Sequence, residues 1–222
     1  GDDGLGQVVG MIGLMEAIKV AKKYGIAFAG CHHSHHFGAG SPYALAACNE
    51  GLILIGGTNA FPSIAPTGAK NIILGNNPLF IGVPRQGAPH FILDIALSAI
   101  ARGKIRKSAE QNKPIPSGIA LDTDGKPTTD PVEALKGYVL PIANHKGYGL
   151  ALAIDLIGGV LTGAGFGTGV LSLFQQWEKP QNVGHFFIVI DPGFLMEKDE
   201  FYLRSNKLFN QIKNSTPWDN NQ

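Results

Sequence analysis

The hydrophobic positions near the start of the chain follow a helical period. Met11, Leu14, Met15 and Ile18 recur at helical spacing, which places them on one face of an amphipathic helix. Gly25 follows this segment as a left-handed cap would, so it predicts the end of the helix. The pattern then changes to short apolar runs, which predict strands.

Helix-like and strand-like segments alternate along the rest of the chain. We expect strands at residues 26–30, 52–55, 80–83, 91–95 and 184–190, and helices from Pro42 to about Asn49, from Gly147 to about Leu161 and from Glu197 to about Lys213. In the middle helix, one face should carry Leu150, Ile154, Ile157 and Leu161, with Gly158 and Gly159 allowing close backbone packing. Such alternation is typical of an α/β protein.

One segment interrupts this rhythm. Residues 105–138 are polar and turn-rich, and the same alternation resumes after them. We interpret them as an excursion over the surface of one domain that spans residues 1–222. The first residues read as the middle of a loop and the last ones stop without a closing element, so we expect the chain to be a piece of something longer.

Composition narrows the class of protein. The chain has 222 residues, 44% of them hydrophobic and 16% charged, which is enough to bury a core and too apolar for a disordered chain. The formal net charge is +1 without a basic block, so nucleic acid is not an expected partner. The longest apolar stretch, residues 148–163, contains Asp155 and is shorter than the roughly 20 residues that span a membrane. Cys31 and Cys48 form neither a zinc-ligand spacing nor a disulfide framework, which favours a reducing, cytoplasmic location.

The largest cluster of reactive side chains lies where the first predicted strand ends. His32, His33, His35 and His36 stand beside a glycine-bearing loop that leads to Ser41 and Pro42, which predict a helix start with a serine cap. Imidazole titrates near neutrality, so a histidine at such a strand-to-loop junction can exchange protons with a bound substrate. Most of the four are expected to be solvated, and one to do chemistry.

Several common sites lack their signatures. No complete dinucleotide fingerprint and no phosphate-binding loop ending in Gly-Lys-Ser or Gly-Lys-Thr is present, and no Gly-x-Ser-x-Gly elbow. A zinc site built from Cys31, His33 and His35 stays a minor alternative, because spacing alone does not show that these ligands converge.

Three further positions carry possible chemistry. Lys146 lies at a loop-to-helix junction, where an ammonium and a helix N-terminus together attract phosphate or carboxylate. Asp94 ends an apolar strand and either accepts hydrogen bonds from ribose or caps a helix that begins near Ser98. His185 opens the last core strand, and its neighbours do not decide whether it faces the same crevice.

A set of short motifs, in order and over nearly the whole chain, resembles the malate/L-lactate dehydrogenase family. These motifs are Gly4-Leu5-Gly6-Gln7, Ser34-His35-His36-Phe37-Gly38, Ala65-Pro66-Thr67-Gly68, Leu74-Gly75-Asn76-Asn77-Pro78, Leu93-Asp94-Ile95-Ala96-Leu97-Ser98, Ala101-Arg102-Gly103-Lys104, Pro127-Thr128-Thr129-Asp130-Pro131, His145-Lys146-Gly147-Tyr148-Gly149 and Pro180 to Phe187. The family includes ureidoglycolate and sulfolactate dehydrogenases and cyclic-imine carboxylate reductases.

The resemblance implies a three-layer α/β fold around a mixed sheet, not a Rossmann fold, in a homodimer that shares its site between subunits. It implies NAD- or NADP-dependent interconversion of a small 2-hydroxy acid and its 2-oxo acid, with His36 as the acid/base. The implied cofactor contacts are Ala60, Asp94, Ile95, Ala96, Lys146, Gly184, His185 and Phe186.

The chain departs from the family pattern in three places. His33 to Phe37 stand where relatives often have Asn-Ser-Asn-His-Phe, and Leu97 where a threonine is common. The family also carries an N-terminal helical segment with an Asp-Ser-His-Gly motif, which has no counterpart in these residues, so residues 1–222 alone are expected to be a poor catalyst. A cyclic-imine carboxylate reductase, or a non-catalytic protein that binds a metal or ligand through the histidines, remains an alternative.

Overall fold

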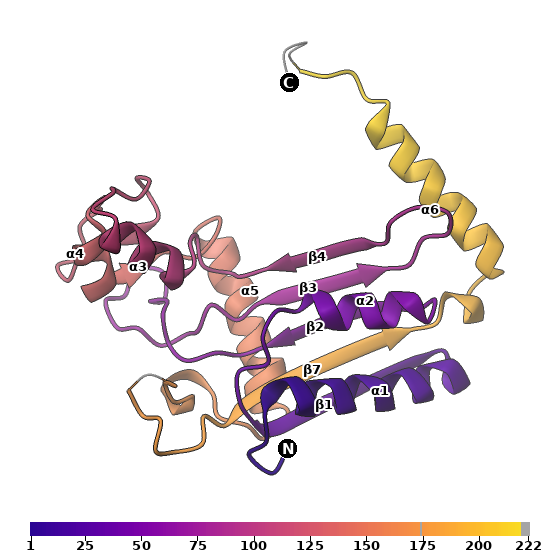
Figure 1. Cartoon of the computed structure of the whole chain (residues 1–222), viewed down its shortest axis with the longest axis horizontal. Helices are drawn as coiled ribbons and strands as arrows, with labels where there is room; N and C mark the ends of the chain where they lie inside the picture. Colours follow the sequence, from indigo (N-terminus) through magenta and orange to yellow (C-terminus); the bar gives the residue numbers. More distant parts are fainter. Residues whose placement is uncertain (174, 219–222) are drawn as a thin grey trace.

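A five-stranded sheet forms the centre of the molecule, and helices cover both of its faces (Figure 1). The computed structural model describes residues 1–173 and 175–218. The strands are β1 (Ile26–Ser34), β2 (Ile53–Thr58), β3 (Leu79–Val83), β4 (Phe91–Ile95) and β7 (Val183–Ile190). The three-layer α/β class expected from the sequence is confirmed.

The pairing of the strands differs from the expected mixed sheet. The order is β1-β7-β2-β3-β4, and each neighbouring pair is antiparallel. The physical reason is the insertion of β7, from the far end of the chain, between β1 and β2. These two strands are joined through a helix and run in the same direction, but they do not pair with each other.

On one face of the sheet lie α1 (Gly6–Tyr24) and α2 (Ser41–Asn49). α1 buries Leu14, Ile18 and neighbouring alanines against the sheet, with Met11 partly buried beside them, whereas Met15 of the predicted apolar face is 41% exposed. It ends at Gly25, whose φ of 88° is the left-handed conformation expected of a C-cap. Phe80 and Phe187 are fully buried beneath these helices.

The opposite face is covered by α5 (His145–Asp155), which continues into the π-helical turn η1 (Leu156–Val160). The expected apolar face is wrong in part, because Ile154 is buried but Leu150 and Leu161 are 46% and 67% exposed. Small residues take the side toward the sheet instead. A Cβ on Gly184 of β7 would collide with the carbonyl oxygen of Gly158, so close backbone packing occurs where it was expected.

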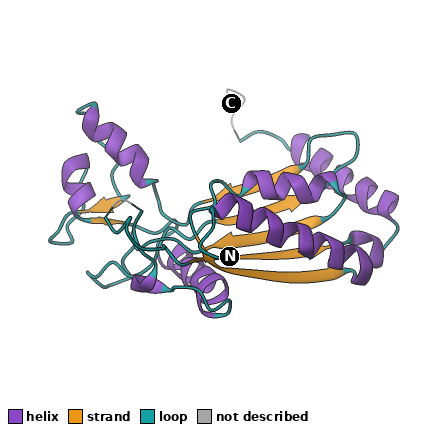
Figure 2. Ribbon diagram, turned by 60° about the horizontal axis from the view of Figure 1, so that its bottom comes forward, coloured by secondary structure: helices purple, strands orange, loops and turns teal. Residues whose placement is uncertain are grey.

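Residues 102–139 fold into a small lobe beside the sheet (Figure 2). The lobe contains α3 (Arg102–Glu110), β5 (Ala120–Leu121), α4 (Pro131–Lys136) and β6 (Tyr138–Val139). It has its own buried cluster of Ile105, Ile115, Ala120, Ala134 and Val139. The segment expected to be an excursion over the surface is therefore locally ordered around apolar side chains.

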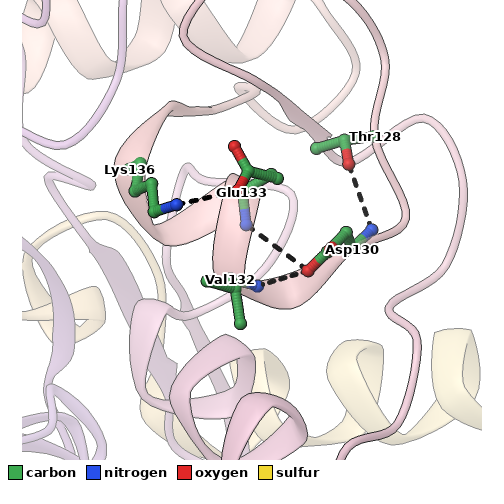
Figure 3. A network of polar contacts seen from close by, with 5 residues as sticks. All are labelled: Thr128, Asp130, Val132, Glu133 and Lys136. Carbon is green, nitrogen blue, oxygen red and sulfur yellow. Dashed lines mark hydrogen bonds and ion pairs between the residues drawn. The ribbon is translucent and has the colours of Figure 1, made fainter.

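A carboxylate fixes the start of α4 in this lobe (Figure 3). Asp130 Oδ1 accepts hydrogen bonds from the backbone N–H groups of Val132 and Glu133, at 2.8 and 3.4 Å, and the Asp130 N–H donates to Thr128 Oγ1. Glu133 and Lys136 pair on the exposed side at 2.8 Å. A helix of only six residues needs such a cap, because so few of its backbone groups bond within it.

The remaining short elements are two 3-10 turns, η2 (Gly167–Gly169) and η3 (Pro192–Phe194), followed by α6 (Lys198–Lys213). α6 contacts the β3–β4 hairpin through Arg85, which stacks on Phe209 and donates to Asn206 Oδ1. It buries none of its residues and points away from the sheet (Figure 1). Within the described residues, no helix is both long and apolar enough to cross a bilayer.

Candidate functional site

A cleft runs between the sheet and the small lobe, with His36 in the middle. It consists of two adjoining cavities of about 350 and 280 Å³. Both are lined by His36, Ala60, Phe61, Asn76 and Gln181. We call the larger cavity, which reaches the lobe, the lobe end, and the smaller one, which lies over the strands, the sheet end.

Different side chains give the two ends different chemistry. The lobe end adds Ser63, Ser98, Ile100, Arg102, Val139 and Leu173. The sheet end adds Phe37, Gly38, Ala39, Thr58, Asn59, Pro78, Asp94, Ala96 and Val183. The lobe end therefore holds a guanidinium and the sheet end a carboxylate, with the imidazole of His36 lining both.

A β-bulge in β1 sets the position of His36. The pairing of β1 with β7 shifts between Cys31 and Ser34, where His33 adopts a φ of 48°. His32 and His33 are exposed on this bulge, whereas the strand continues to Ser34, beyond the end expected from the sequence. The chain then leaves the sheet and carries the exposed His36 to the cleft.

Two hydrogen bonds orient His36. Its backbone N–H donates to Oε1 of the buried Gln181 at 2.9 Å, and its ring Nδ1 accepts from the backbone N–H of Gly38 at 3.1 Å. A neutral imidazole that accepts at Nδ1 keeps its proton on Nε2, so the ring is set as a donor through Nε2. To accept a proton at Nε2, the ring has to give up the contact with Gly38 and place a proton on Nδ1.

A buried histidine supports the loop from below. His185 is fully buried, with Nε2 2.8 Å from Ser34 Oγ and Nδ1 2.7 Å from Thr58 Oγ1. Its ring stacks on Phe37 with centroids 4.7 Å apart. Burial, with a smaller effect of the charge of His36, lowers the pKa of His185 to about 3, so it is uncharged at neutral pH. The predicted cofactor contact at His185 is thus a covered side chain whose ring nitrogens both have protein partners.

Asp94 forms the cap of α2. Its Oδ2 accepts from the backbone N–H of Ser41 at 2.8 Å and from the Ser41 hydroxyl at 2.6 Å. The expected serine cap is wrong, because Ser41 is already inside the helix and donates its hydroxyl to the aspartate. The helix expected near Ser98 begins at Arg102 instead, and Asp94 does not cap it. Within the described residues, the Oδ1 atom of Asp94 makes no hydrogen bond, and this oxygen can accept from ribose hydroxyls of a dinucleotide at the sheet end.

Buried amides hold the floor of the cleft at Ala60. The Ala60 N–H donates to Asn77 Oδ1 at 3.0 Å, and Asn77 Nδ2 donates to the Ala151 carbonyl of α5 at 2.8 Å. Asn59 donates to Asp155 Oδ1 and accepts from the Gly184 N–H. Burial raises the pKa of Asp155, opposed by the hydrogen bonds from Gly167 and Asn59. This network joins β2, β7 and α5 directly behind the cleft.

The structure brings together only some of the cofactor contacts that the resemblance implies. Ala60, Asp94 and Ala96 line the sheet end next to His36. Ile95 and Phe186 lie in the apolar cluster beneath α5, and Gly184 is buried against η1. Lys146 is exposed in the first turn of α5, just after Ala143 and Asn144, which have φ values of 50° and 54°.

Sequence reasoning missed Gln181, Asn76, Ser98 and Arg102 as side chains of the cleft. Each lies within a motif that carried the resemblance, yet no periodicity or spacing marks any of them as functional. Nor do the histidines converge on a metal. Among the described residues, no group of three or more His, Cys, Asp or Glu side chains is placed to hold an ion.

Together, the fold and the cleft define an α/β protein with a cavity between a sheet and a small lobe, beside an exposed histidine. The chain belongs to the malate/L-lactate dehydrogenase family, whose profile matches residues 1–222. This finding confirms the resemblance drawn from the motifs.

The curated relatives are dehydrogenases of different hydroxy acids. L-sulfolactate dehydrogenase of Methanocaldococcus jannaschii is 44% identical over 217 residues, covering 98% of this chain and 62% of the relative. (2R)-3-sulfolactate dehydrogenase (NADP(+)) of Chromohalobacter salexigens is 39% identical, with 82% and 54% covered. Ureidoglycolate dehydrogenase (NAD(+)) of Escherichia coli is 35% identical, with 97% and 61% covered. This chain therefore spans less than two thirds of the length of each of these relatives.

Solved structures share the fold. The sulfolactate dehydrogenase from Methanocaldococcus jannaschii superposes with a TM-score of 0.91 at 43% identity, covering 99% of this chain and 63% of that structure. Malate dehydrogenase from Pyrococcus horikoshii gives a TM-score of 0.87 at 35% identity, covering 100% and 62%. Their agreement with this chain extends to the mostly antiparallel sheet.

Proposed function

We propose that this chain is the dinucleotide- and substrate-binding domain of an NAD(P)-dependent dehydrogenase that interconverts a small 2-hydroxy acid and its 2-oxo acid. The observation that carries the proposal is the position of His36, which lines both ends of one cleft. Hydride transfer needs substrate carbon and nicotinamide side by side, with an acid/base at the reacting oxygen. The names of the relatives support the same class of reaction.

In the reducing direction, His36 would act as an imidazolium that has given up its contact with Gly38, and it would donate the Nε2 proton to the oxygen of the 2-oxo acid as hydride reaches the carbonyl carbon, which leaves a neutral ring with its proton on Nδ1. The hydrogen bond that the His36 backbone N–H donates to Gln181 Oε1 would fix the loop, and His185 beneath Phe37 would keep the loop from collapsing into the sheet. In the oxidising direction, the ring would exchange its contact with Gly38 and accept the hydroxyl proton at Nε2. The bound nicotinamide would supply or accept the hydride.

The sheet end fits the ribose side of a dinucleotide. Asp94 Oδ1 would accept from ribose hydroxyls, and Ala60 and Ala96 would line the same cavity. Lys146, at the N-terminus of α5, would meet a phosphate of the cofactor. The other four predicted cofactor contacts are covered by protein, so they would fix the floor of this cavity without touching the cofactor through their side chains. They are Gly184, His185, Phe186 and Ile95.

We further propose that the full-length protein is a cytoplasmic homodimer. Exposed apolar side chains follow the outer side of α5 and η1, at Leu152, Leu156, Val160 and Leu161. A stripe of this kind supports contact with a second copy of the chain. Leu156→Glu is expected to shift the sedimentation coefficient from dimer to monomer, and an unchanged coefficient would contradict the placement of the interface.

A substrate screen tests the proposed activity directly. The full-length protein is incubated with NADH or NADPH and a panel of 2-oxo acids, and cofactor oxidation is followed by absorbance. Turnover with at least one small 2-oxo acid is expected. Tight dinucleotide binding without turnover on any member of the panel would contradict the assigned reaction.

A further inference from the structure

The lobe end of the cleft is lined by the cationic side chain of Arg102. Among the described residues that line this cavity, none is an aspartate or glutamate. The guanidinium is half-buried, and its Nη2 donates to the Leu135 carbonyl at 2.6 Å. A guanidinium has five N–H donors in a planar fork, so most of its donors remain available for another acceptor.

The charge around Arg102 also favours an anion. Burial, together with the positive charge of Arg106 one turn along α3, lowers the pKa of Arg102. Its guanidinium still stays charged at neutral pH, because an arginine pKa lies far above that range. The positive charge of Arg106 adds to that of Arg102 on this side of α3, and both charges attract an anion near Arg102.

Ser98 provides a second and independent sign of a ligand. It is only 8% exposed, it lines the same cavity as Arg102, and its Oγ is covered without a hydrogen-bond partner in the part of the chain that the structure describes. A buried hydroxyl without a partner is unfavourable, and most such groups are satisfied by water or ligand.

The position of the lobe end relative to His36 and Asp94 indicates whether substrate or cofactor occupies it. Both the lobe end and the sheet end meet at His36, but the sheet end contains the carboxylate of Asp94. A carboxylate repels an anionic substrate and suits ribose hydroxyls, whereas a guanidinium suits a carboxylate or sulfonate with its paired oxygens. The anionic substrate therefore belongs at the lobe end.

We propose that Arg102 and Ser98 form the subsite that binds an anionic oxygen group, a carboxylate or sulfonate, of the substrate. This inference rests on the proposed function, since it assigns one end of that cleft to the substrate. Arg102 supplies the charge and the forked donors, and the Ser98 hydroxyl adds a hydrogen bond. The lobe is then the part of the chain that selects the substrate.

Malonate binding to the full-length protein tests the subsite without any catalysis. Calorimetry compares the wild type with Arg102→Gln, Ser98→Ala and Lys107→Gln. Lys107 is the matched control, because its loss removes the same charge from an exposed position on α3 outside the cleft. We expect the malonate Kd to rise about 10- to 100-fold in Arg102→Gln and about 3- to 10-fold in Ser98→Ala, and to change less than about twofold in Lys107→Gln.

Kinetics then identify which anionic group is bound. In Arg102→Gln the KM for the 2-oxo acid is expected to rise by a larger factor than kcat falls, while the Kd of the dinucleotide stays nearly constant. A rise for both pyruvate and oxaloacetate supports contact with the carboxylate beside the carbonyl. A rise for oxaloacetate alone supports contact with the second anionic group.

Arg102→Gln also removes the hydrogen bond to the Leu135 carbonyl, so a loss of malonate binding could come from a destabilised lobe, and Ser98→Ala distinguishes the two causes. If the melting temperature of Arg102→Gln lies far below that of the wild type, the malonate Kd of Ser98→Ala becomes the test of the subsite, because this variant keeps the Arg102–Leu135 hydrogen bond. An unchanged malonate affinity in Ser98→Ala under that condition, or in a stably folded Arg102→Gln, would overturn the proposal. Malonate binding through Arg102 in a protein that reduces no 2-oxo acid would contradict the proposed function and leave the anion subsite standing.

Discussion

The two ends of the cleft are built in different ways. At the sheet end, the carboxylate of Asp94 lies on β4 and already holds the start of α2 through Ser41. At the lobe end, the guanidinium of Arg102 starts α3, inside a lobe that has its own buried cluster. The sheet end is thus fixed by strand register and the lobe end by a separate core, so the residues that line the lobe end can change without disturbing the sheet.

His36 is where the two ends meet, and its replacement should have the largest effect. His36→Ala is expected to lower kcat by about 10²- to 10⁴-fold, the usual range for a lost general acid/base, with little change in cofactor affinity. The measurement is steady-state turnover of the full-length protein together with a cofactor titration. His32→Ala, on the exposed part of the bulge, is the control and should retain near-normal turnover.

The support beneath the sheet end should make the fold sensitive to acid. His185 has a pKa of about 3 in the folded protein and about 6.5 when unfolded, so between these values the unfolded chain binds a proton that the folded chain does not. The contribution of the uncharged His185 to the free energy of unfolding should therefore be complete above pH 6.5. On acidification below pH 6.5 the free energy of unfolding should fall by on the order of 1.4 kcal/mol per pH unit.

Urea unfolding at pH 7 and pH 5 measures this slope. His185→Gln should be less stable than the wild type at pH 7 but lose less stability on acidification, because the titrating group is gone. His32→Gln should keep the wild-type slope. An equal slope in wild type and His185→Gln would show that His185 does not set the acid sensitivity.

Lys146 tests how far the cofactor extends beyond the sheet end. Lys146→Ala is expected to raise the dinucleotide Kd by about tenfold at low salt, since an ammonium beside a phosphate forms a charge-assisted contact. The difference should shrink as salt is added, because the side chain is exposed. Calorimetry at two ionic strengths measures both effects, and an unchanged Kd at low salt would make Lys146 an ordinary surface charge.

The smallest expected effect concerns the cap of α2. Asp94→Ala removes the acceptor for both hydrogen bonds from Ser41 and should lower the free energy of unfolding by about 1 kcal/mol, as for other lost N-caps. Ser41→Ala removes only the hydroxyl bond and should cost less. Denaturant midpoints of the two variants measure the difference, and equal midpoints would contradict the role of the backbone bond.

Local patterns predicted the elements of the fold better than their assembly. The helical period before Gly25 and the apolar runs at β3 and β4 depend on neighbouring residues, and the structure has these elements close to the predicted bounds. The insertion of β7 between β1 and β2 depends on contacts between distant parts of the chain, which no local pattern encodes. The buried side of α5 was predicted in part wrongly, because glycines and alanine, not the leucines, approach the sheet there.

The same limit applies to the cleft. The histidine cluster can be recognised from the sequence because its members lie within a few residues of one another. Gln181 cannot be recognised in this way, since it lies 145 positions from His36 in the sequence. Asp94 was predicted to bind ribose or to cap a helix, but the helix that it caps lies 53 positions earlier. Arg102 was noted in the sequence only as part of a motif of the resemblance, and it is the fold of the lobe that brings it to the same cavity as His36.

Isotope transfer tests the central claim, that a cofactor at the sheet end and a substrate at the lobe end react beside His36. The full-length protein is given NADH that carries deuterium at both C4 positions, together with an accepted 2-oxo acid, and the product is examined by NMR and mass spectrometry. The account predicts one deuterium on C2 of the 2-hydroxy acid, at a rate that falls in His36→Ala. A product that takes its C2 hydrogen from solvent, or an equal rate in His36→Ala, would contradict it.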